Sequence, residues 1–451
     1  MFKDVTIDFT DSKGKTLDTI VIAGINGSGK TSLLQLLQSL FSEGLNLFKI
    51  QSILHKYEKE ENALICDEVE LELDISADEK SRLISLAHKY TSKSSKSAVR
   101  NKIDSVFKRI ETLFGQKGRC VKFLYQLEKR EKGFIIHRND FQFFGILPEN
   151  ELTSIFKVLY FSAVHGDVKK TTSGNTIADF FKDKSSIDNV NSDGIVFPID
   201  IFSHRKTVET HITESVTAKL MADRDLLAKD VIKQAIFDVN NLLEGINLKT
   251  KLVDVDSKQP IFQSVCSPKV SSDELSGGEK QLYYKAILFD KLRPQNSIVM
   301  VDESETSLHP TWQQEVLKLY KNIPGNNQVI LVTHSPHIIA SIHPDNLFVL
   351  HVNEDEKTVE CFNARDKGLH TRGNEPNDIL DEIMGTPLRD TNTQKRIDEL
   401  SERLALYPKD GDKPEVQTLI NNLIEDLGKL DPFIMRLNHQ LMMIKRRQLS
   451  Q

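Results

Sequence analysis

Three apolar runs of strand length, each ending in small, polar or charged residues, form the most regular pattern along the chain. They are Thr19–Gly24 (TIVIAG), Ser297–Ser304 (SIVMVDES) and Val329–His337 (VILVTHSPH). Continuous apolar runs of this length are typical of strands that are buried within a sheet. From Ser297 to Val349 strand-like and helix-like segments alternate. That alternation predicts a parallel α/β sheet.

Alternation of polar and apolar residues predicts shorter strands in the first part of the chain. We expect strands at Phe2–Phe9, Glu68–Ile75 and Val158–Ala163, and a hairpin formed by Val121–Leu127 and Gly133–His137. Two further strand-like pieces follow residue 243.

Apolar residues at helical spacing predict two long helical stretches. The first, Asp78–Phe114, is interrupted by a Ser/Lys-rich segment, and the second runs from about Val208 to Leu243. Between the Val158–Ala163 strand and the second helical stretch, Gly166–Gly194 is polar and rich in Ser, Asp, Lys and Asn. Such a composition indicates an exposed loop or a mobile lid.

The chain after residue 353 is predicted to be helical. One apolar stripe at helical spacing consists of Val416, Leu419, Ile420, Leu423, Ile424 and Leu427, and a second of Phe433, Leu437, Leu441 and Ile444. Asp431 and Pro432 suit the N-cap and first turn of the second of these helices. We expect both stripes to serve packing or subunit contacts rather than a ligand site.

Composition excludes several classes of protein. The 451 residues are 39% hydrophobic and 27% charged, which is typical of a soluble protein with two or three domain-sized units. The net charge of −6 argues against electrostatic binding of nucleic acid by the whole surface, so any such contact needs a local basic patch. The four scattered cysteines suggest reduced thiols. With no signal-peptide pattern and no apolar run near the ~18 residues of a membrane span, we expect a cytoplasmic protein without membrane contact.

The segment Gly24–Thr31 (GINGSGKT) matches the pattern G-x-x-x-x-G-K-[ST] and lies between a predicted strand and an apolar helix. That context is the one a phosphate-binding loop requires, because glycines let the backbone N–H groups surround the phosphates at a helix N-terminus. The lysine would reach the β- and γ-phosphates, and the threonine would ligate Mg²⁺. We therefore expect the ATP-binding residues to be Asn26, Gly27, Ser28, Gly29, Lys30 and Thr31, with Thr31 also a metal ligand.

The other two apolar runs end in residues suited to hydrolysis. Asp302 suits a Walker B carboxylate that holds Mg²⁺, and Glu303 suits a general base that polarises the attacking water. A strand ending in Asp-Glu is also common as a solvated strand end, so this interpretation depends on the phosphate-binding loop. Parallel strands direct their carboxyl ends at a ligand crevice, which predicts that His334 lies beside the γ-phosphate.

The segment Asp273–Gln281 (DELSGGEKQ) places two glycines at the start of a predicted helix. Ser276 and Glu279 fit a capping box, which accounts for the serine and the glutamate. Gly277 and Gly278 are not explained by the cap, since glycine costs about 1 kcal/mol in a helix relative to alanine. Glycines at a helix N-terminus allow close approach by an anion. We interpret this segment as a second phosphate contact, made to a nucleotide held by another copy of the chain.

These motifs together resemble the ABC-type ATPases, in the order Walker A, signature, Walker B and switch histidine. The resemblance implies an α/β ABC-ATPase head, a P-loop mixed sheet with helices, that carries helical insertions and a helical C-terminal region. It also implies a head-to-tail dimer in which Ser276, Gly277, Gly278 and Glu279 contact, in trans, the ATP of the other subunit. The family's glutamine loop and adenine contact are not assigned, because Gln51 lies too early and Gln126 lies within a predicted strand.

The segment Asp302–Pro310 (DESETSLHP) looks like the DEPExxLHP pattern of the stand-alone RecF/OLD-like (AAA_21-like) members. Glu305 and His309 match that pattern, and Ser304 replaces its usual proline. A transporter motor does not fit the long insertions between Walker A and the signature, or the LHP sequence. An SMC-type chromosome protein would need long heptad arms within that insertion, which is predicted to contain strands and polar loops instead. An OLD-type nuclease would need a TOPRIM domain after the switch histidine, where this chain is helical, so we expect no nuclease activity.

The diffuse C-terminal similarity, from NDILDEIMGTPLRD to LGKLDPFIMRLNHQLMMIKRRQ, is to the PtuA-like ATPase subunits of Septu and retron-associated anti-phage systems. It implies a companion HNH endonuclease (PtuB-like) and a homo-oligomer built from ATPase dimers. The alternative is a DNA repair or recombination ATPase that binds DNA directly, through basic segments such as Lys93–Lys108 or Lys445–Arg447.

The expected domain organisation follows the motifs. Residues 1–165 would form an ATPase lobe with a helical insert near 78–118, and residues 166–245 a polar loop and helical lid. Residues 246–352 would form the lobe with the signature, Walker B and switch histidine. Residues 353–451 would form a helical region for oligomer or partner contacts.

Overall fold

A computed structural model of the protein describes most of the predicted ATPase elements and the C-terminal helices. The described residues are 5–34, 37, 68–74, 81–82, 85, 120–130, 133–139, 157–161, 227–256, 259–353, 358–386, 388–406 and 413–449. The predicted helical stretch at 78–114 and the polar segment at 166–194 lie almost wholly outside them. The chain divides into two compact units, Met1–Pro376 and Asn377–Gln451.

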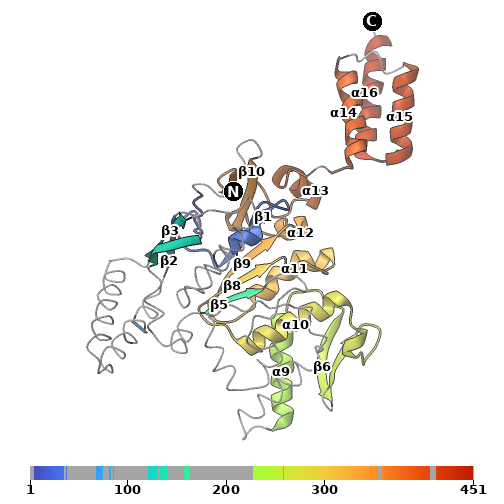
Figure 1. Ribbon diagram of the computed structural model, residues 1–451. Coiled ribbons are helices and arrows are strands. Elements are labelled where there is room, and N and C mark those ends of the chain that lie inside the picture. The colour runs from blue at the N-terminus through green and yellow to red at the C-terminus, as the bar shows by residue number, and fades with distance from the viewer. Residues whose placement is uncertain are drawn as a thin grey trace. The chain divides into compact units, whose positions relative to one another are not determined.

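The first unit is built on a six-stranded mixed sheet with the strand order β11-β10-β1-β9-β8-β5 (Figure 1). Its strands are β1 (Thr19–Gly24), β5 (Lys157–Phe161), β8 (Ser297–Asp302), β9 (Gln328–Thr333), β10 (Leu347–Asn353) and β11 (Thr358–Asn363). All neighbours pair in parallel except β11, which is antiparallel to β10. The structure confirms the predicted α/β architecture.

The three apolar runs of the sequence are the centre of this sheet. Every residue of β1 is buried, and β8 and β9 are buried at nearly every position. Helices alternate with these strands along the chain. α10 (Gly277–Leu292) precedes β8, α11 (Pro310–Lys321) follows β8, and α12 (Pro336–Ile339) follows β9. The starts of α11 and α12 are set by a side-chain cap followed by proline, with His309 and Ser335 as the capping residues.

Two smaller antiparallel sheets belong to the same unit. One has the order β2-β3-β4, formed by β2 (Glu68–Asp74), β3 (Cys120–Arg130) and β4 (Gly133–Asn139). The other pairs β6 (Thr250–Asp256) with β7 (Gln259–Ser264). These strands confirm the predicted hairpin, the strand near residue 68 and the two pieces after residue 243. Short 3₁₀ turns at Ser272–Glu274 and Pro344–Asn346 complete the unit.

Two expectations for this unit differ from what the described residues show. Residues 5–9 are not a strand, because the described pairing there is a single antiparallel bridge between Thr10 and Thr16 across a turn. The helical stretch expected from about Val208 to Leu243 is interrupted, because Leu227 has an extended backbone just before α9 (Ala228–Leu242), and residues 208–226 lie outside the described residues. Helix α9 packs against β6 and α10, and its Val231, Ala235 and Val239 side chains are buried.

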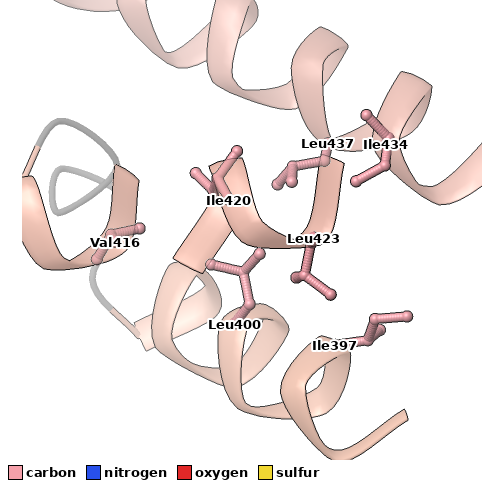
Figure 2. Close-up of a cluster of buried hydrophobic side chains, with 7 residues drawn as sticks. All are labelled: Ile397, Leu400, Val416, Ile420, Leu423, Ile434 and Leu437. Atoms are coloured by element: carbon pink, nitrogen blue, oxygen red, sulfur yellow. The ribbon is translucent and has the colours of Figure 1, made fainter. Parts of the chain in front are cut away.

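The second unit is a three-helix bundle of α14 (Thr391–Leu406), α15 (Pro414–Leu427) and α16 (Pro432–Leu449). A short α13 (Pro376–Asp378) and a π-helical turn at Ile379–Ile383 precede it. Figure 2 shows side chains from all three helices gathered in its core, which consists of Ile397, Leu400, Val416, Ile420, Leu423, Ile434 and Leu437. The predicted stripes therefore serve packing.

Two contacts show how the last helix of the bundle begins. Asp431 accepts a hydrogen bond from the Phe433 N–H at 2.9 Å, as expected for a cap, and forms a bidentate pair with Arg389.

The expected boundary at residue 352 does not match the compact units. Residues 358–363 form β11, which pairs with β10 and so keeps this segment in the sheet. Among the described helices, none is both long enough and apolar enough to span a membrane.

Candidate functional site

The phosphate-binding loop connects β1 to the helix that begins at Lys30. Gly27 and Gly29 adopt φ values of 82° and 89°, which favour glycine. A side chain at Gly24 would have its Cβ 2.6 Å from Ser28 Oγ and 2.7 Å from the Leu350 carbonyl oxygen, so only glycine fits there. Asn26 and Gly27 are exposed, whereas the Ser28 hydroxyl is buried and has no hydrogen-bond partner. The loop has the backbone form that its sequence predicts.

Lys30 and Thr31 lie at the mouth of this loop. The Lys30 ammonium donates to the carbonyls of Gly24 and Ile25 at 2.8 and 2.9 Å. Burial lowers the pKa of Lys30, and the nearby carboxylates oppose that effect. The Thr31 hydroxyl lies 3.3 Å from Asp302 Oδ1. The structure thus brings together a cation that suits a phosphate and two oxygens that suit a metal, with Thr31 and Asp302 lying 271 residues apart in the chain.

Sheet register explains why these segments meet. β9 lies between β1 and β8, with Ala23 paired to Thr333 and Asp302 paired to Val332. All three strands are parallel, so their carboxyl ends share one edge of the sheet. The phosphate-binding loop, Glu303 and His334 follow directly after these ends. This edge is the candidate active site.

Asp302 is buried at this edge, and its pKa is raised to about 6, mainly by burial. The Thr31 hydroxyl and the Lys30 charge act in the opposite direction, whereas the charges of Glu303 and Glu305 add to the effect of burial. A buried carboxylate with no cation bound to it destabilises the fold. A buried carboxyl group with a raised pKa at the end of a strand is a candidate functional group.

We predict that Asp302→Asn raises the melting temperature of the nucleotide-free protein above pH 6. The folded pKa of about 6 lies above the unfolded value near 3.8, so the folded protein holds the proton more tightly. Stability is then lost as pH rises between these values, by about 2–3 kcal/mol in total. The asparagine variant avoids this loss, and its advantage should vanish below about pH 4. Thermal melts of both proteins from pH 4 to 8 test this, and an equal difference at all pH values would contradict it.

Glu303 and His334 approach each other across the site. Glu303 Oε1 lies 3.4 Å from His334 Nδ1, and both side chains are partly exposed. Glu303 has a φ of 48°, a left-handed conformation that is uncommon for a residue other than glycine. Such backbone strain is typical of functional positions and costs on the order of 1–3 kcal/mol. The two residues that sequence reasoning assigned to hydrolysis are thus brought together.

Glu305 is a site residue whose role sequence reasoning missed. Its buried Oε1 accepts hydrogen bonds from the Thr333 hydroxyl at 2.5 Å and from the His334 N–H at 3.0 Å, and lies 3.6 Å from His334 Nδ1. The Glu305 carboxylate therefore links the turn after β8 to the end of β9 through these hydrogen bonds. Its match to the DEPExxLHP pattern was the available signal in the sequence.

The signature segment begins α10 with the predicted capping box. The Ser276 hydroxyl accepts from the Glu279 N–H, and Glu279 Oε2 accepts from the Ser276 N–H at 3.0 Å. Glu279 Oε1 also accepts from the Thr250 hydroxyl at 2.8 Å, and the residue is buried. The Glu279 carboxylate is therefore used within the chain, whereas Ser276 and Gly277 are exposed.

The two glycines of the signature have different surroundings in the structure. A Cβ at Gly277 would meet nothing within 4 Å, so this position is open to an incoming group. A Cβ at Gly278 would lie 2.7 Å from the Trp312 ring and 3.1 Å from the Ser307 carbonyl oxygen. Gly278 is thus required for packing of α10 against the start of α11 in the same chain.

We predict opposite effects of alanine at these two positions. Gly278→Ala should lower the stability of the fold by about 1–3 kcal/mol, because Trp312 must move. Gly277→Ala should leave stability unchanged or slightly higher, since alanine favours the helix. Thermal melts of the two variants check this, and equal destabilisation by both would contradict it.

Within the described residues, the phosphate-binding loop and the signature contact different parts of the chain. The contacts of the loop lead to Asp302, and those of the signature lead to Thr250, Ser307 and Trp312. No described contact joins Ser276 to the loop of its own chain. This separation is compatible with a signature that acts on another copy.

The residues at the sheet edge suit Mg²⁺ together with a nucleotide. Thr31 and Asp302 offer hard oxygen ligands, and the buried Ser28 hydroxyl has no partner. Among the described residues, no group of three or more His, Cys, Asp or Glu side chains could hold a metal ion on its own. Mg²⁺ typically binds through one or two protein ligands plus phosphate oxygens and water, so the set fits this ion.

Similarity to known proteins was found at three levels. A family model described as the RecF/RecN/SMC N-terminal domain matches residues 3–358. The Septu protein PtuA of Bacillus thuringiensis is 29% identical over 112 residues, which are 25% of this chain and 28% of that protein. The retron Vc95 probable ATPase of Vibrio cholerae serotype O1 biovar El Tor is 30% identical over 124 residues, covering 23% of this chain and 24% of that protein. The matches span about a quarter of each relative.

Solved structures were also compared with the chain. The SMC head domain from Thermotoga maritima covers 76% of this chain and 89% of its own, at 12% identity and a TM-score of 0.34. The Smc head domain bound to the C-terminal domain of ScpA, derived from Pyrococcus furiosus, gives 12% identity and a TM-score of 0.39, with 81% and 94% covered. These scores are too low to support the assignment, which depends on the family model.

That family model covers most of the chain, from before the phosphate-binding loop to beyond the switch histidine. Within the matched residues, the strand order brings Lys30, Thr31, Asp302, Glu303 and His334 to one edge of the sheet. The chain belongs to the RecF/RecN/SMC N-terminal domain family.

Proposed function

We propose that this protein is an ABC-type ATPase subunit of an anti-phage defence complex, which controls a partner HNH nuclease through ATP-dependent dimerisation. The observation that carries the ATPase part is the meeting of the phosphate-binding loop, the Thr31–Asp302 pair and the Glu303–His334 pair at one sheet edge. The defence part is supported by the relatives named Septu PtuA and retron ATPase.

Each site residue has a distinct role in the proposed hydrolysis. The backbone N–H groups of the loop from Asn26 to Gly29 bind the phosphates, and Lys30 neutralises the β- and γ-phosphates. Glu303 accepts a proton from the attacking water while the bond between the γ-phosphorus and the bridging oxygen breaks. His334 donates a hydrogen bond to the γ-phosphate or orients the water. The products are ADP and inorganic phosphate.

Thr31 and Asp302 would hold Mg²⁺. When bound, the ion neutralises charge that develops on the phosphate oxygens. Asp302 must be ionised for this role, and burial, which raises its pKa to about 6, opposes that ionisation. The bound cation would supply a positive partner for the Asp302 carboxylate, which would couple metal binding to the stability of the site.

The signature supports a head-to-tail dimer. Exposed Ser276 and Gly277 lie at the N-terminus of the sixteen-residue helix α10, where the helix dipole favours an anion. Their own chain already binds nucleotide through a different helix end. A second copy would therefore bring its γ-phosphate to this position and complete two sites at once.

The second unit is proposed to contact partners. Its helix α16 exposes Met435, Met442 and Met443, and Leu430 just before the helix is also exposed. Exposed methionines suit adaptable apolar contacts. An oligomer or a small nuclease could use this surface, which the bundle core does not require.

The test combines the purified chain with its companion. Mass should increase when ATP and Mg²⁺ are added, and a small HNH protein encoded beside this chain should co-purify with it. DNA cleavage should require that companion and respond to ATP. Absence of both turnover and ATP-dependent association would overturn the ATPase proposal. Salt-dependent DNA binding by the chain alone, without a nuclease companion, would instead favour a repair ATPase.

A further inference from the structure

Helix α10 rests on the turn between β8 and α11 at two points. Gly278 in its first turn packs against Trp312 and the Ser307 carbonyl. Further along, the Lys285 ammonium donates a hydrogen bond to the Ser304 carbonyl at 3.0 Å. The contacts are seven residues apart, which is about two helical turns or ~10 Å. The helix that begins with the signature therefore supports the turn that carries Glu303.

Lys285 is an unusual residue for this place. It is only 2% exposed, and few lysines are buried to this extent without a function or a partner. Its described hydrogen bond goes to a backbone carbonyl. Burial lowers its pKa to about 8, and the charge of Glu305 opposes that effect. The ammonium is thus still charged at neutral pH and interacts electrostatically with Glu305.

The turn that Lys285 supports is strained and leads to the catalytic groups. Glu303 and Ser307 have φ values of 48° and 66°, so the turn needs external support. Ser304 lies between Glu303 and Glu305 in the chain. Glu305 in turn accepts hydrogen bonds from Thr333 and His334. A shift of Lys285 would therefore move the carboxylate of Glu303 and loosen the support of His334.

We propose that Lys285 is a positioning residue that couples the signature helix to the hydrolytic residues of the same subunit. In the dimer on which this proposal rests, Ser276 and Gly277 contact ATP held by the other subunit. Contact with that ATP fixes the position of α10. The hydrogen bond from Lys285 to the Ser304 carbonyl then fixes the turn that carries Glu303 relative to α10. Each subunit then hydrolyses its own ATP efficiently only while its signature holds the ATP of its partner.

The experiment measures ATP turnover of the full chain with Lys285→Met. Methionine keeps the apolar volume and removes the charge, which favours folding of the variant. We expect kcat to fall about 10–100-fold, the scale of a small misplacement of catalytic groups. KM for ATP and ATP-dependent association, measured by light scattering, should stay within about twofold of wild type. Lys321→Met, at an exposed lysine of α11, is the matched control and should retain wild-type kcat.

Glu305→Gln provides a second test of the same turn, with Lys285 unchanged. We expect it to lower kcat, and the double variant with Lys285→Met to be no slower than the slower single variant, because both act through one turn. Wild-type kcat in folded Lys285→Met, wild-type kcat in Glu305→Gln, or additive losses in the double variant would overturn the inference. If wild type itself shows no turnover, the proposed ATPase function fails instead, so the two failures are distinguishable.

Discussion

Glu303→Gln is expected to lower ATP turnover by at least about 10²-fold while leaving ATP binding intact. The amide keeps the size of the side chain and its approach to His334, but it cannot accept the proton of the attacking water. Because the nucleotide is not consumed, the variant should also accumulate as the ATP-bound dimer. Turnover by phosphate release and mass by light scattering, each with ATP and Mg²⁺, measure these two effects.

The matched control for this variant is Glu360→Gln, at an exposed position of the edge strand β11. It makes the same chemical change outside the motifs and should leave kcat unchanged. Wild-type turnover in Glu303→Gln would show that another group activates the water. Loss of ATP binding together with turnover would show instead that Glu303 serves to hold the site together.

Lys30→Ala is expected to abolish nucleotide binding and, with it, every ATP-dependent property. The ammonium lies buried at the loop mouth and is bonded only to the carbonyls of Gly24 and Ile25 in its described hydrogen bonds. It can exchange these neutral acceptors for phosphate oxygens, which form stronger, charge-assisted bonds. We expect Kd for ATP to rise at least about 10²-fold, which corresponds to ~2.7 kcal/mol or more.

Lys13→Ala, at an exposed lysine of the N-terminal turn, is the control for this loss of charge and should bind ATP normally. Calorimetry measures binding, and mass with and without ATP measures assembly. If Lys30→Ala leaves both assembly and control of the nuclease unchanged, nucleotide binding does not regulate the complex.

Local patterns predicted the sheet core and the capping residues well. TIVIAG, SIVMVD and the strand at Gln328–Thr333 could hardly form anything but buried strands, because continuous apolar runs bounded by polar residues have few other stable arrangements. The Ser276–Glu279 capping box needs only residues three apart, and it forms as expected. The Asp431 cap and the apolar stripes of the last two helices follow for the same local reason.

Predictions that depended on distant partners were less complete. Residues 5–9 alternate, but a strand also needs a neighbour, and the described pairing is the Thr10–Thr16 bridge. The segment at 358–363 was expected to be helical, yet β10 offers a free edge and pairs with it. In both cases the outcome depends on hydrogen-bond partners that local periodicity does not reveal.

By itself, the sequence determined which residues can bind phosphate, ligate a metal and act as a base, because these capacities belong to residue types at short spacings. Tertiary structure alone decided how they meet. Parallel pairing of β1, β9 and β8 brings Thr31 to Asp302, and the turn after β8 brings Glu303 to His334. Tertiary structure also gives the two signature glycines different surroundings, since Gly278 packs against Trp312 whereas the space beside Gly277 is open. Contacts between residues far apart in the chain are set by packing and register, which no local pattern contains.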